Sequence, residues 1–310
     1  MPQLARWILV FSLVAGLGVR PLEAGQAQSV PVAPQNPSTA PSPAPQQPTD
    51  DEDRLTRLVE PDFTVVNLPT TLRLPKYKFN FRLTHRFLGN LRQGSFTDQL
   101  DDLFGLDNGA IIGLELRFAP IRHVQAIVYR NNLNKTIQFA GQYDAIRQGE
   151  SFPLSLSAIG SIEGTNNFRS GHSDDEGEDD GHDHGVANGH RSPALGGVVS
   201  RTFSDRLAVY AVPMWVHHVI PNPPRDTFYI GVGGRGRISR NVYVVGEVSP
   251  RVNGFAAGDL EYAFGIERRA GGHMFQLTFS NSLGSTYGQI AQGGFPDTIY
   301  LGFNLGRKFY

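Results

Sequence analysis

The sequence predicts an all-β protein, an antiparallel transmembrane β-barrel of about twelve strands. Three observations predict this fold. Many stretches alternate between apolar residues and polar or small ones, as strands with two different faces do. The connections between these stretches are alternately short and long. Residues 297–309 form a last alternating stretch that closes on an aromatic residue, which suits a C-terminal strand that closes the barrel.

Residues 1–27 have the organisation of a secretory signal peptide. Arg6 precedes an apolar core over residues 7–19, and small residues follow up to Ala27. The core is shorter than the roughly 20 residues that a helix needs to span a bilayer. We therefore expect cleavage near Ala24 or Ala27 and export, with an uncleaved anchor as the alternative. The chain has no cysteine, so it offers no lipid attachment site and no disulfide framework.

Residues 28–60 are predicted to be a Pro-rich, disordered periplasmic tether. Residues 28–50 contain seven prolines and no aromatic residue, a composition that cannot build a core. The outer-membrane β-barrel domain then occupies residues 61–310.

The first strand, at 77–86, shows the alternation most clearly. Tyr77, Phe79, Phe81 and Leu83 face one way, and polar or charged residues face the other. Strands at 193–203 and 207–217 alternate less regularly, and the second contains Pro213. Eleven further strands are predicted, at 110–118, 123–130, 135–146, 153–163, 193–203, 207–217, 227–238, 242–250, 259–268, 273–281 and 297–309.

The connection lengths support a membrane barrel. Outer-membrane barrels have short periplasmic turns and longer external loops. The two kinds alternate along this chain with one exception, the tight connection at 131–134. A secreted β-sandwich also has alternating strands but does not predict such sorting. The short connections are 119–122, 147–152, 204–206, 239–241 and 269–272, and the long ones are 87–109, 164–192, 218–226, 251–258 and 282–296.

The charged face of each strand is expected to line the lumen, because a charged residue facing lipid at mid-depth costs about 2 to 4 kcal/mol. Such residues either line a polar channel or pair across the lumen and block it. Twelve strands lie between the filled eight-stranded barrels and the open ones of sixteen or more. The predicted lumen-lining residues are Lys78, Arg82, Arg86, Glu115, Arg117, Glu163, Arg235, Arg237, Glu247, Arg251, Glu261 and Glu267.

The stretch "GVGGRG" at 231–236 has the spacing of a dinucleotide-binding loop. That motif needs a helix after it, whereas an alternating strand runs through this one. Gly231 and Gly233 are therefore expected to make room in the lumen.

A His/Asp-rich external loop is predicted at 164–192. Its segment 171–190 holds four of the nine histidines and seven acidic residues. Imidazole and carboxylate groups suit Zn²⁺, Ni²⁺ or Cu²⁺, although a solvated acidic loop has the same composition. No cofactor is required, and a divalent metal is the one candidate. The "WVHH" stretch places His217 and His218 at the same rim. The candidate metal ligands of the loop are His172, His182, Asp183, His184 and His190.

Two classes of function find no support. A formal net charge of −1 gives no reason to expect a nucleic-acid partner. No G-x-S-x-G motif marks a hydrolase, and we predict that the protein is not an enzyme.

Four stretches, "LPTTLRLPKYKFNFRLTHRF", "LFGLDNGAIIGLELRFAP", "VYRNNLNKTIQFAGQY" and "YLGFNLGRKF", resemble an uncharacterised family of membrane-bound β-barrel domains. The resemblance implies a barrel over about residues 60–310 and no established activity. The last strand also resembles the assembly signal of outer-membrane barrels. This implies the lipid bilayer and the barrel assembly machinery as partners, and a Gram-negative-type outer membrane as the location. The residues that carry this signal are Phe303, Leu305, Phe309 and Tyr310.

Two functions follow as hypotheses. The first is a small passive pore for polar solutes or ions, whose access is tuned by the acidic His-rich loop. The alternative is a non-conducting surface barrel that binds a divalent metal or another partner through that loop.

Overall fold

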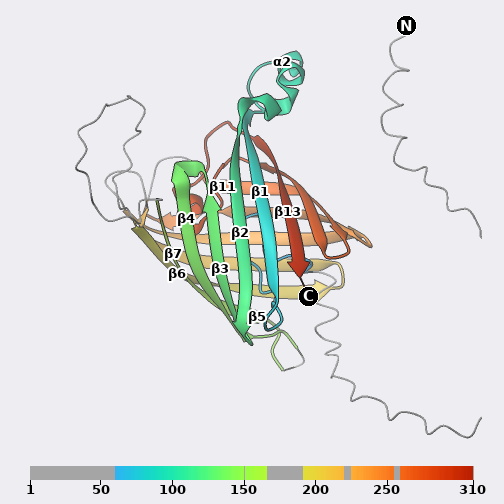
Figure 1. Cartoon of the computed structure of the whole chain (residues 1–310), viewed down its shortest axis with the longest axis vertical. Helices are drawn as coiled ribbons and strands as arrows, with labels where there is room; N and C mark the ends of the chain where they lie inside the picture. The colour runs from blue at the N-terminus through green and yellow to red at the C-terminus, as the bar shows by residue number, and fades with distance from the viewer. Residues whose placement is uncertain (1–59, 150, 166–190, 220–224, 255–258, 310) are drawn as a thin grey trace, which may run out of the picture. The chain divides into compact units, whose positions relative to one another are not determined.

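The computed structural model describes residues 60–149, 151–165, 191–219, 225–254 and 259–309. Its strands form one antiparallel sheet that closes on itself, as predicted (Figure 1). The strands are β1 (Phe79–Asn90), β2 (Ala110–Ile121), β3 (Val124–Asn131), β4 (Thr136–Ile146), β5 (Ser155–Thr165), β6 (Arg191–Ser204), β7 (Leu207–Val219), β8 (Arg225–Ser239), β9 (Val242–Ser249), β10 (Arg251–Asn253), β11 (Glu261–Ala270), β12 (His273–Ser280) and β13 (Tyr300–Phe309).

The wall has twelve strand positions, because β9 and β10 occupy one of them. They are separated at Pro250, which has no N–H to give to the ladder, and both pair with β8. Closure occurs between β1 and β13, where Phe79 lies opposite Phe309. The two rings stack with centroids 4.4 Å apart. The prediction that the last strand closes the barrel is confirmed.

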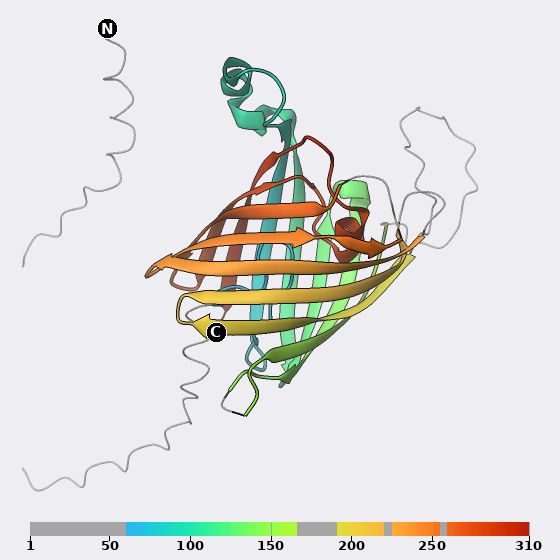
Figure 2. The same cartoon turned by 180° about the vertical axis from the view of Figure 1, so that it is seen from behind.

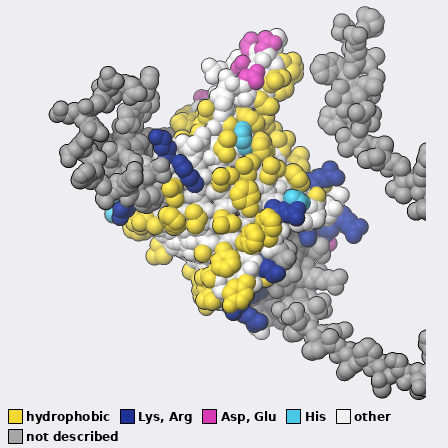
Figure 3. Space-filling model, in the orientation of Figure 1, with side chains coloured by type: hydrophobic (Ala, Val, Ile, Leu, Met, Phe, Trp, Pro, Cys, Tyr) yellow, Lys and Arg dark blue, Asp and Glu magenta, His cyan; other side chains and the backbone are white. Residues whose placement is uncertain are grey.

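The two faces of the wall differ as the alternation predicts. On the outer face, the Leu116 and Phe264 side chains are 50% and 46% exposed, while the neighbouring Glu115 and Glu267 point inward and are buried. Hydrophobic side chains cover much of the face shown in Figure 3. Within the part of the chain that is described, no helix is long and apolar enough to cross a membrane.

The two ends of the barrel have different connections. The short-turn end carries the described connections 122–123, 205–206, 240–241 and 271–272, and the long-loop end carries the described connections 91–109, 132–135 and 281–299. The tight 132–135 connection, which contains η2 (Leu133–Lys135), lies at the long-loop end, as the sequence indicated.

The 91–109 connection projects from the long-loop end (Figures 1 and 2). It contains α2 (Phe96–Asp101) and η1 (Leu103–Asn108). The Asp98 carboxylate accepts the Ser95 backbone N–H at 2.6 Å, and this hydrogen bond lowers the pKa of Asp98. The Ser95 hydroxyl in turn caps the Asp98 backbone N–H, so the short helix has a complete capping box.

Both irregular strands are present, as β6 and β7. Near Pro213 the regular β6–β7 pairing is interrupted, and Gly197 and Val198 of β6 have no paired residue on β7. The two strands approach each other closely there: a Cβ on Gly196 would lie 2.3 Å from the Pro213 carbonyl oxygen. Glycine on β6 therefore lets the sheet accommodate a proline on β7.

Candidate functional site

The lumen of the barrel is filled by the chain's own residues 60–74, which we call the plug. These residues precede β1, and all are buried except the half-buried Arg73. Phe63, Val65, Val66 and Leu68 are at most 1% exposed. Glu60, predicted to belong to the tether, has its side chain buried in the lumen with the rest of the plug.

The plug is a tight hairpin. Thr64 and Pro69 form an isolated antiparallel bridge. The Val65 N–H donates to the Leu68 carbonyl at 2.8 Å, and the Thr70 N–H donates to the Phe63 carbonyl at 2.9 Å. The residues at the tip, 66 and 67, are thus left to bond with the wall.

Glu247 on β9 is the main anchor of the tip. Its carboxylate accepts the backbone N–H groups of Val66 at 2.9 Å, Asn67 at 2.7 Å and Leu68 at 3.1 Å. Hydrogen bonds to a charged group contribute about 1.5 to 3 kcal/mol each, so this carboxylate is a strong local attachment.

The Asn67 side chain is held between two more ionisable groups. Its amide nitrogen donates to Glu261 on β11 at 3.1 Å, and its amide oxygen accepts from Arg86 on β1 at 3.1 Å. Arg86 also donates to Asn304 on β13 at 2.8 Å. One asparagine therefore joins strands on both sides of the β1–β13 junction.

Carbonyl groups of the plug face donors on the wall. Arg82 donates to the Val66 carbonyl. Gln276 donates to the Val65 carbonyl at 2.7 Å, and Arg235 to the Thr64 carbonyl at 2.7 Å. Arg235 also pairs with Glu267 at 2.9 Å, and both side chains are 0% exposed. The charged side chains of the lumen thus bind the plug and also pair with one another.

Two glycines of β8 make space for the hairpin. A Cβ on Gly231 would lie 2.6 Å from a methyl group of Leu68, and one on Gly233 would lie 3.2 Å from Val65. A larger side chain at Gly231 would overlap the plug. The "GVGGRG" stretch lies inside β8, with no helix after it.

The second half of the plug is held nearer the short-turn end. Gln142 and Gln125 donate to the Thr70 and Leu72 carbonyls, both at 3.0 Å. The Phe63 ring lies between two cations, Arg117 at 5.0 Å and Lys308 at 4.9 Å from its centroid. A cavity of about 270 Å³ remains beside the first residues of the plug. It is lined by Pro61, Asp62, Asn80, Arg269, Gly271, Gly272, His273, Met274, Gly306 and Lys308.

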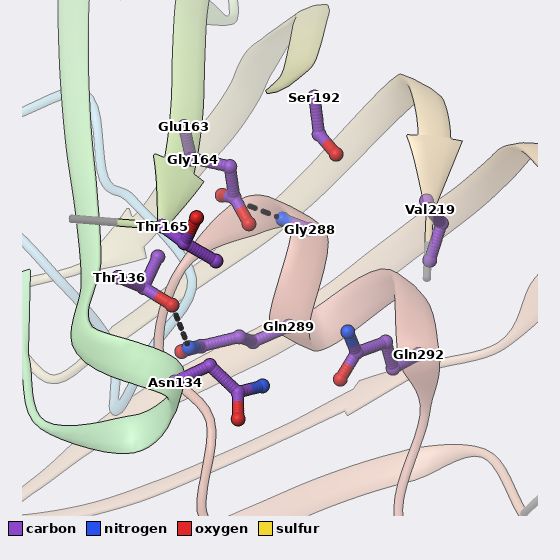
Figure 4. Close-up of a pocket in the computed structure, with 10 residues that line it drawn as sticks. All are labelled: Asn134, Thr136, Glu163, Gly164, Thr165, Ser192, Val219, Gly288, Gln289 and Gln292. Carbon is purple, nitrogen blue, oxygen red and sulfur yellow. Dashed lines mark hydrogen bonds between the residues drawn. The ribbon is translucent and has the colours of Figure 1, made fainter. Parts of the chain in front are cut away.

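A second segment fills the lumen from the long-loop end. Residues 282–296 are predicted to form an external loop, but α3 (Tyr287–Gln292) within this segment folds inward and is buried through Ala291. Glu163 on β5 accepts the Gly288 N–H at 3.0 Å (Figure 4). It also accepts the Thr286 hydroxyl at 3.1 Å. Tyr287 and Ile290 join the plug's Val65 and Leu68 in one apolar cluster.

Replacing Glu163 with alanine is expected to release α3 from the wall. The change removes the acceptor for Gly288 and Thr286, a loss of about 1.5 to 3 kcal/mol. Hydrogen exchange at residues 286–291 should become roughly ten- to a hundredfold faster, since each 1.4 kcal/mol is a factor of ten. Exchange at residues 114–118 of β2, which pair with β1 and β3, is the internal control. An unchanged rate at Gly288 would contradict the assignment of Glu163 as the α3 anchor.

Nine of the twelve residues predicted to line the lumen have buried side chains, and three are half-buried. The buried ones are Arg82, Arg86, Glu115, Arg117, Glu163, Arg235, Glu247, Glu261 and Glu267. Lys78, Arg237 and Arg251 are the half-buried ones, near the ends of their strands. The plug and α3 that these charges contact were not predicted. The one available signal was the run of apolar residues in "FTVVNL", between the tether and the first strand.

The predicted metal ligands of the loop, His172, His182, Asp183, His184 and His190, lie outside the described residues, and so does Tyr310 of the assembly signal. Phe303, Leu305 and Phe309 point outward from β13. His217 and His218 lie at the end of β7, at the long-loop end, with Asp226 of β8 beside them.

Three solved structures are similar to this chain at low identity. The KdgM porin has a TM-score of 0.45 and 7% identity, with 75% of this chain and 99% of that chain covered. The NanC porin has a TM-score of 0.47 and 9% identity, with 75% of this chain and 99% of that chain covered. Omp33 of Acinetobacter baumannii has a TM-score of 0.40 and 10% identity, with 77% of this chain and 100% of that chain covered. The search of curated proteins finds no match.

The family comparison is more specific than these likenesses. The family described as "Membrane bound beta barrel domain (DUF5777)" matches residues 62–309, which include most of the plug and all thirteen strands. The predicted resemblance is confirmed, and the chain belongs to this family of membrane-bound β-barrel domains.

Proposed function

We propose that the protein is a pore-forming barrel of a Gram-negative-type outer membrane, exported by a cleaved signal peptide, whose lumen is closed by its own plug. The pore would pass polar solutes or ions once residues 60–74, and α3 packed against them, leave the lumen. The short turns and long loops at opposite ends, and the apolar outer face, support this location.

The observation that carries the proposal is the polarity of the wall behind the plug. Polar side chains surround a segment whose own polar groups are mostly backbone amides and carbonyls. Buried polar groups need hydrogen-bond partners, and here the plug's backbone supplies many of them. If the plug leaves, water can form hydrogen bonds with the same wall groups. An apolar wall would offer water no hydrogen-bonding groups.

Several atoms of the wall have no protein partner even with the plug in place. They include Arg82 Nε, Arg86 Nε, and both amide atoms of Asn80, among the described residues. Such groups are ordinarily satisfied by water. The wall is thus already suited to a hydrated lumen, which supports an open state.

Conductance in a planar lipid bilayer tests the proposal. We compare the full chain with two variants, in which Gly/Ser segments of equal length replace residues 60–74 alone or residues 60–74 together with 286–292. The full chain is expected to give rare or no current steps, and the variant without plug and α3 to give discrete, sustained ones. Glu247→Gln, which weakens the anchor of the tip, should open more often than the full chain.

Asp101→Asn is the matched control, because it makes the same change from carboxylate to amide on exposed α2, outside the lumen. Deleting residues 171–190 is a second arm. If that deletion raises conductance and replacement of the plug does not, the His/Asp-rich loop is the gate. A folded barrel that stays silent in every variant overturns the pore and favours the alternative, a surface barrel that binds metal or another partner through that loop.

A further inference from the structure

His217, His218 and Asp226 come together at an irregularity of the β7–β8 pair. Val216 lies opposite Thr227 and Val219 lies opposite Arg225. Two residues of β7, His217 and His218, therefore face one residue of β8, Asp226. This is a β-bulge, a feature that redirects side chains near functional sites.

The bulge turns both histidines to the same side of the wall. Adjacent residues of a regular strand point to opposite faces. Here His218 has a φ of 52°, and the buried residues on either side are Val216 and Val219. The two imidazole rings stack with centroids 3.6 Å apart, on the outer side. A positive φ costs a non-glycine residue about 1 to 3 kcal/mol, so surrounding contacts must hold it.

Contacts from both neighbouring strands hold the bulge. The His218 N–H donates to the Asp226 carboxylate at 3.1 Å. The Ser192 hydroxyl of β6 donates to the His218 carbonyl at 2.9 Å. The same Asp226 oxygen lies 2.7 Å from Nδ1 of His217. The positions of the three side chains are thus set by the sheet.

We propose that His217, His218 and Asp226 bind a divalent transition-metal ion at the long-loop rim. One ligand atom from each residue lies within 4.8 Å of the other two. Zn²⁺ holds nitrogen and oxygen ligands at about 2.0 to 2.2 Å, so ligand atoms in a tetrahedral site are about 3 to 4 Å apart. Small side-chain rotations bring the three atoms to that spacing.

The three side chains favour zinc, copper or nickel as the bound ion. Two neutral imidazoles and one carboxylate are ligands that these ions accept, and three protein ligands leave a position for water. The His217 and Asp226 side chains are 35% and 48% exposed, so an ion can reach them. The ion pair between His217 and Asp226 supplies two of the ligands, and His218 adds a second imidazole on the same face.

Trp215 provides a local probe of the site. Its ring lies 5.6 Å from that of His217. The chain has one other tryptophan, Trp7, so Trp7→Phe leaves Trp215 as the single indole fluorophore. Bound Cu²⁺ quenches a tryptophan at such short range, and Zn²⁺, which does not quench, competes for the same site.

The experiment is a titration of the refolded full chain carrying Trp7→Phe with Cu²⁺. Asparagine or glutamine replaces His172, His182, His184 and His190, so that the loop does not compete. We expect saturable quenching at one equivalent of Cu²⁺, reversed by Zn²⁺. His217→Asn, His218→Asn and Asp226→Asn should each weaken binding at least about tenfold, because even outer contacts of a metal site contribute ten- to a hundredfold.

His123→Asn is the matched control. His123 also has a positive φ, 66°, but lies in a turn at the short-turn end. Asparagine tolerates that backbone conformation, so His218→Asn and His123→Asn should both keep the fold. Equal quenching in all variants overturns the site, and so does quenching only at millimolar Cu²⁺, an adventitious ion only. Asp226→Asn, on the other strand, gives an independent result if a histidine variant fails to fold.

Discussion

Replacing Arg235 with methionine is expected to lower the free energy of unfolding by about 3 to 5 kcal/mol, the range for removing one partner of a buried ion pair. Glu267 would be left at 0% exposure without the guanidinium 2.9 Å away. The plug would also lose the donor to its Thr64 carbonyl. Equilibrium unfolding in urea, followed in detergent micelles or liposomes, measures this change.

A double variant separates the lost pair from the lost packing. Arg235→Met combined with Glu267→Leu removes both charges and should be less destabilising than Arg235→Met alone. Arg240→Met is the control, since Arg240 is exposed on the 240–241 turn and should change stability by no more than about 0.5 kcal/mol. If Arg235→Met behaves like this control, the buried pair does not hold the lumen together.

Replacing Gly231 with leucine is expected to expel the tip of the plug. A Cβ there would already lie 2.6 Å from Leu68, and the rest of the side chain needs the same space. Overpacking of this kind costs about 1 to 3 kcal/mol. Amide hydrogen exchange at residues 65–68 should be at least about tenfold faster, and the bilayer conductance should rise.

Gly160→Leu is the matched control for this prediction. Gly160 is exposed on the outer face of β5, and a Cβ there meets nothing within 4 Å. Leu68→Ala added to Gly231→Leu should return exchange toward the original rate, because it frees the contested space. Slow exchange at 65–68 in Gly231→Leu alone would contradict the close fit between β8 and the plug.

The strands of the wall could be predicted from sequence because each one shows its own alternation of apolar and polar residues. Phe79 and Phe81 alternate with Asn80 and Arg82, and the cost of placing Arg82 in lipid fixes which face is inward. The prediction of a strand is confirmed even for β7, where Pro213 interrupts the usual pattern. The alternation has a period of two within a single strand, so it can be recognised without knowing which strand pairs with it.

The contents of the lumen could not be predicted in the same way. Glu247 was expected to face inward, but its partners are the backbone N–H groups of residues 66–68, which no residue type reveals. Residues 60–74 are buried on every side, so they show no alternation. His217 and His218 were placed at the rim, yet the rule of alternating faces separates them, and only the φ of His218 brings them together.

The attachment of the plug on both sides of the β1–β13 junction also changes the order in which the barrel can form. The contact between Arg86 and Asn304 across that junction joins residues 218 positions apart, whereas Val66 and Arg82 are 16 apart. Closing the shorter loop costs about 2 kcal/mol less chain entropy. The contact between Val65 and Gln276 on β12 spans 211 positions and closes the long loop once, so β1 then reaches its final neighbours through a short connection. The hairpin that fills the lumen thereby serves as a template on which the first and last strands meet.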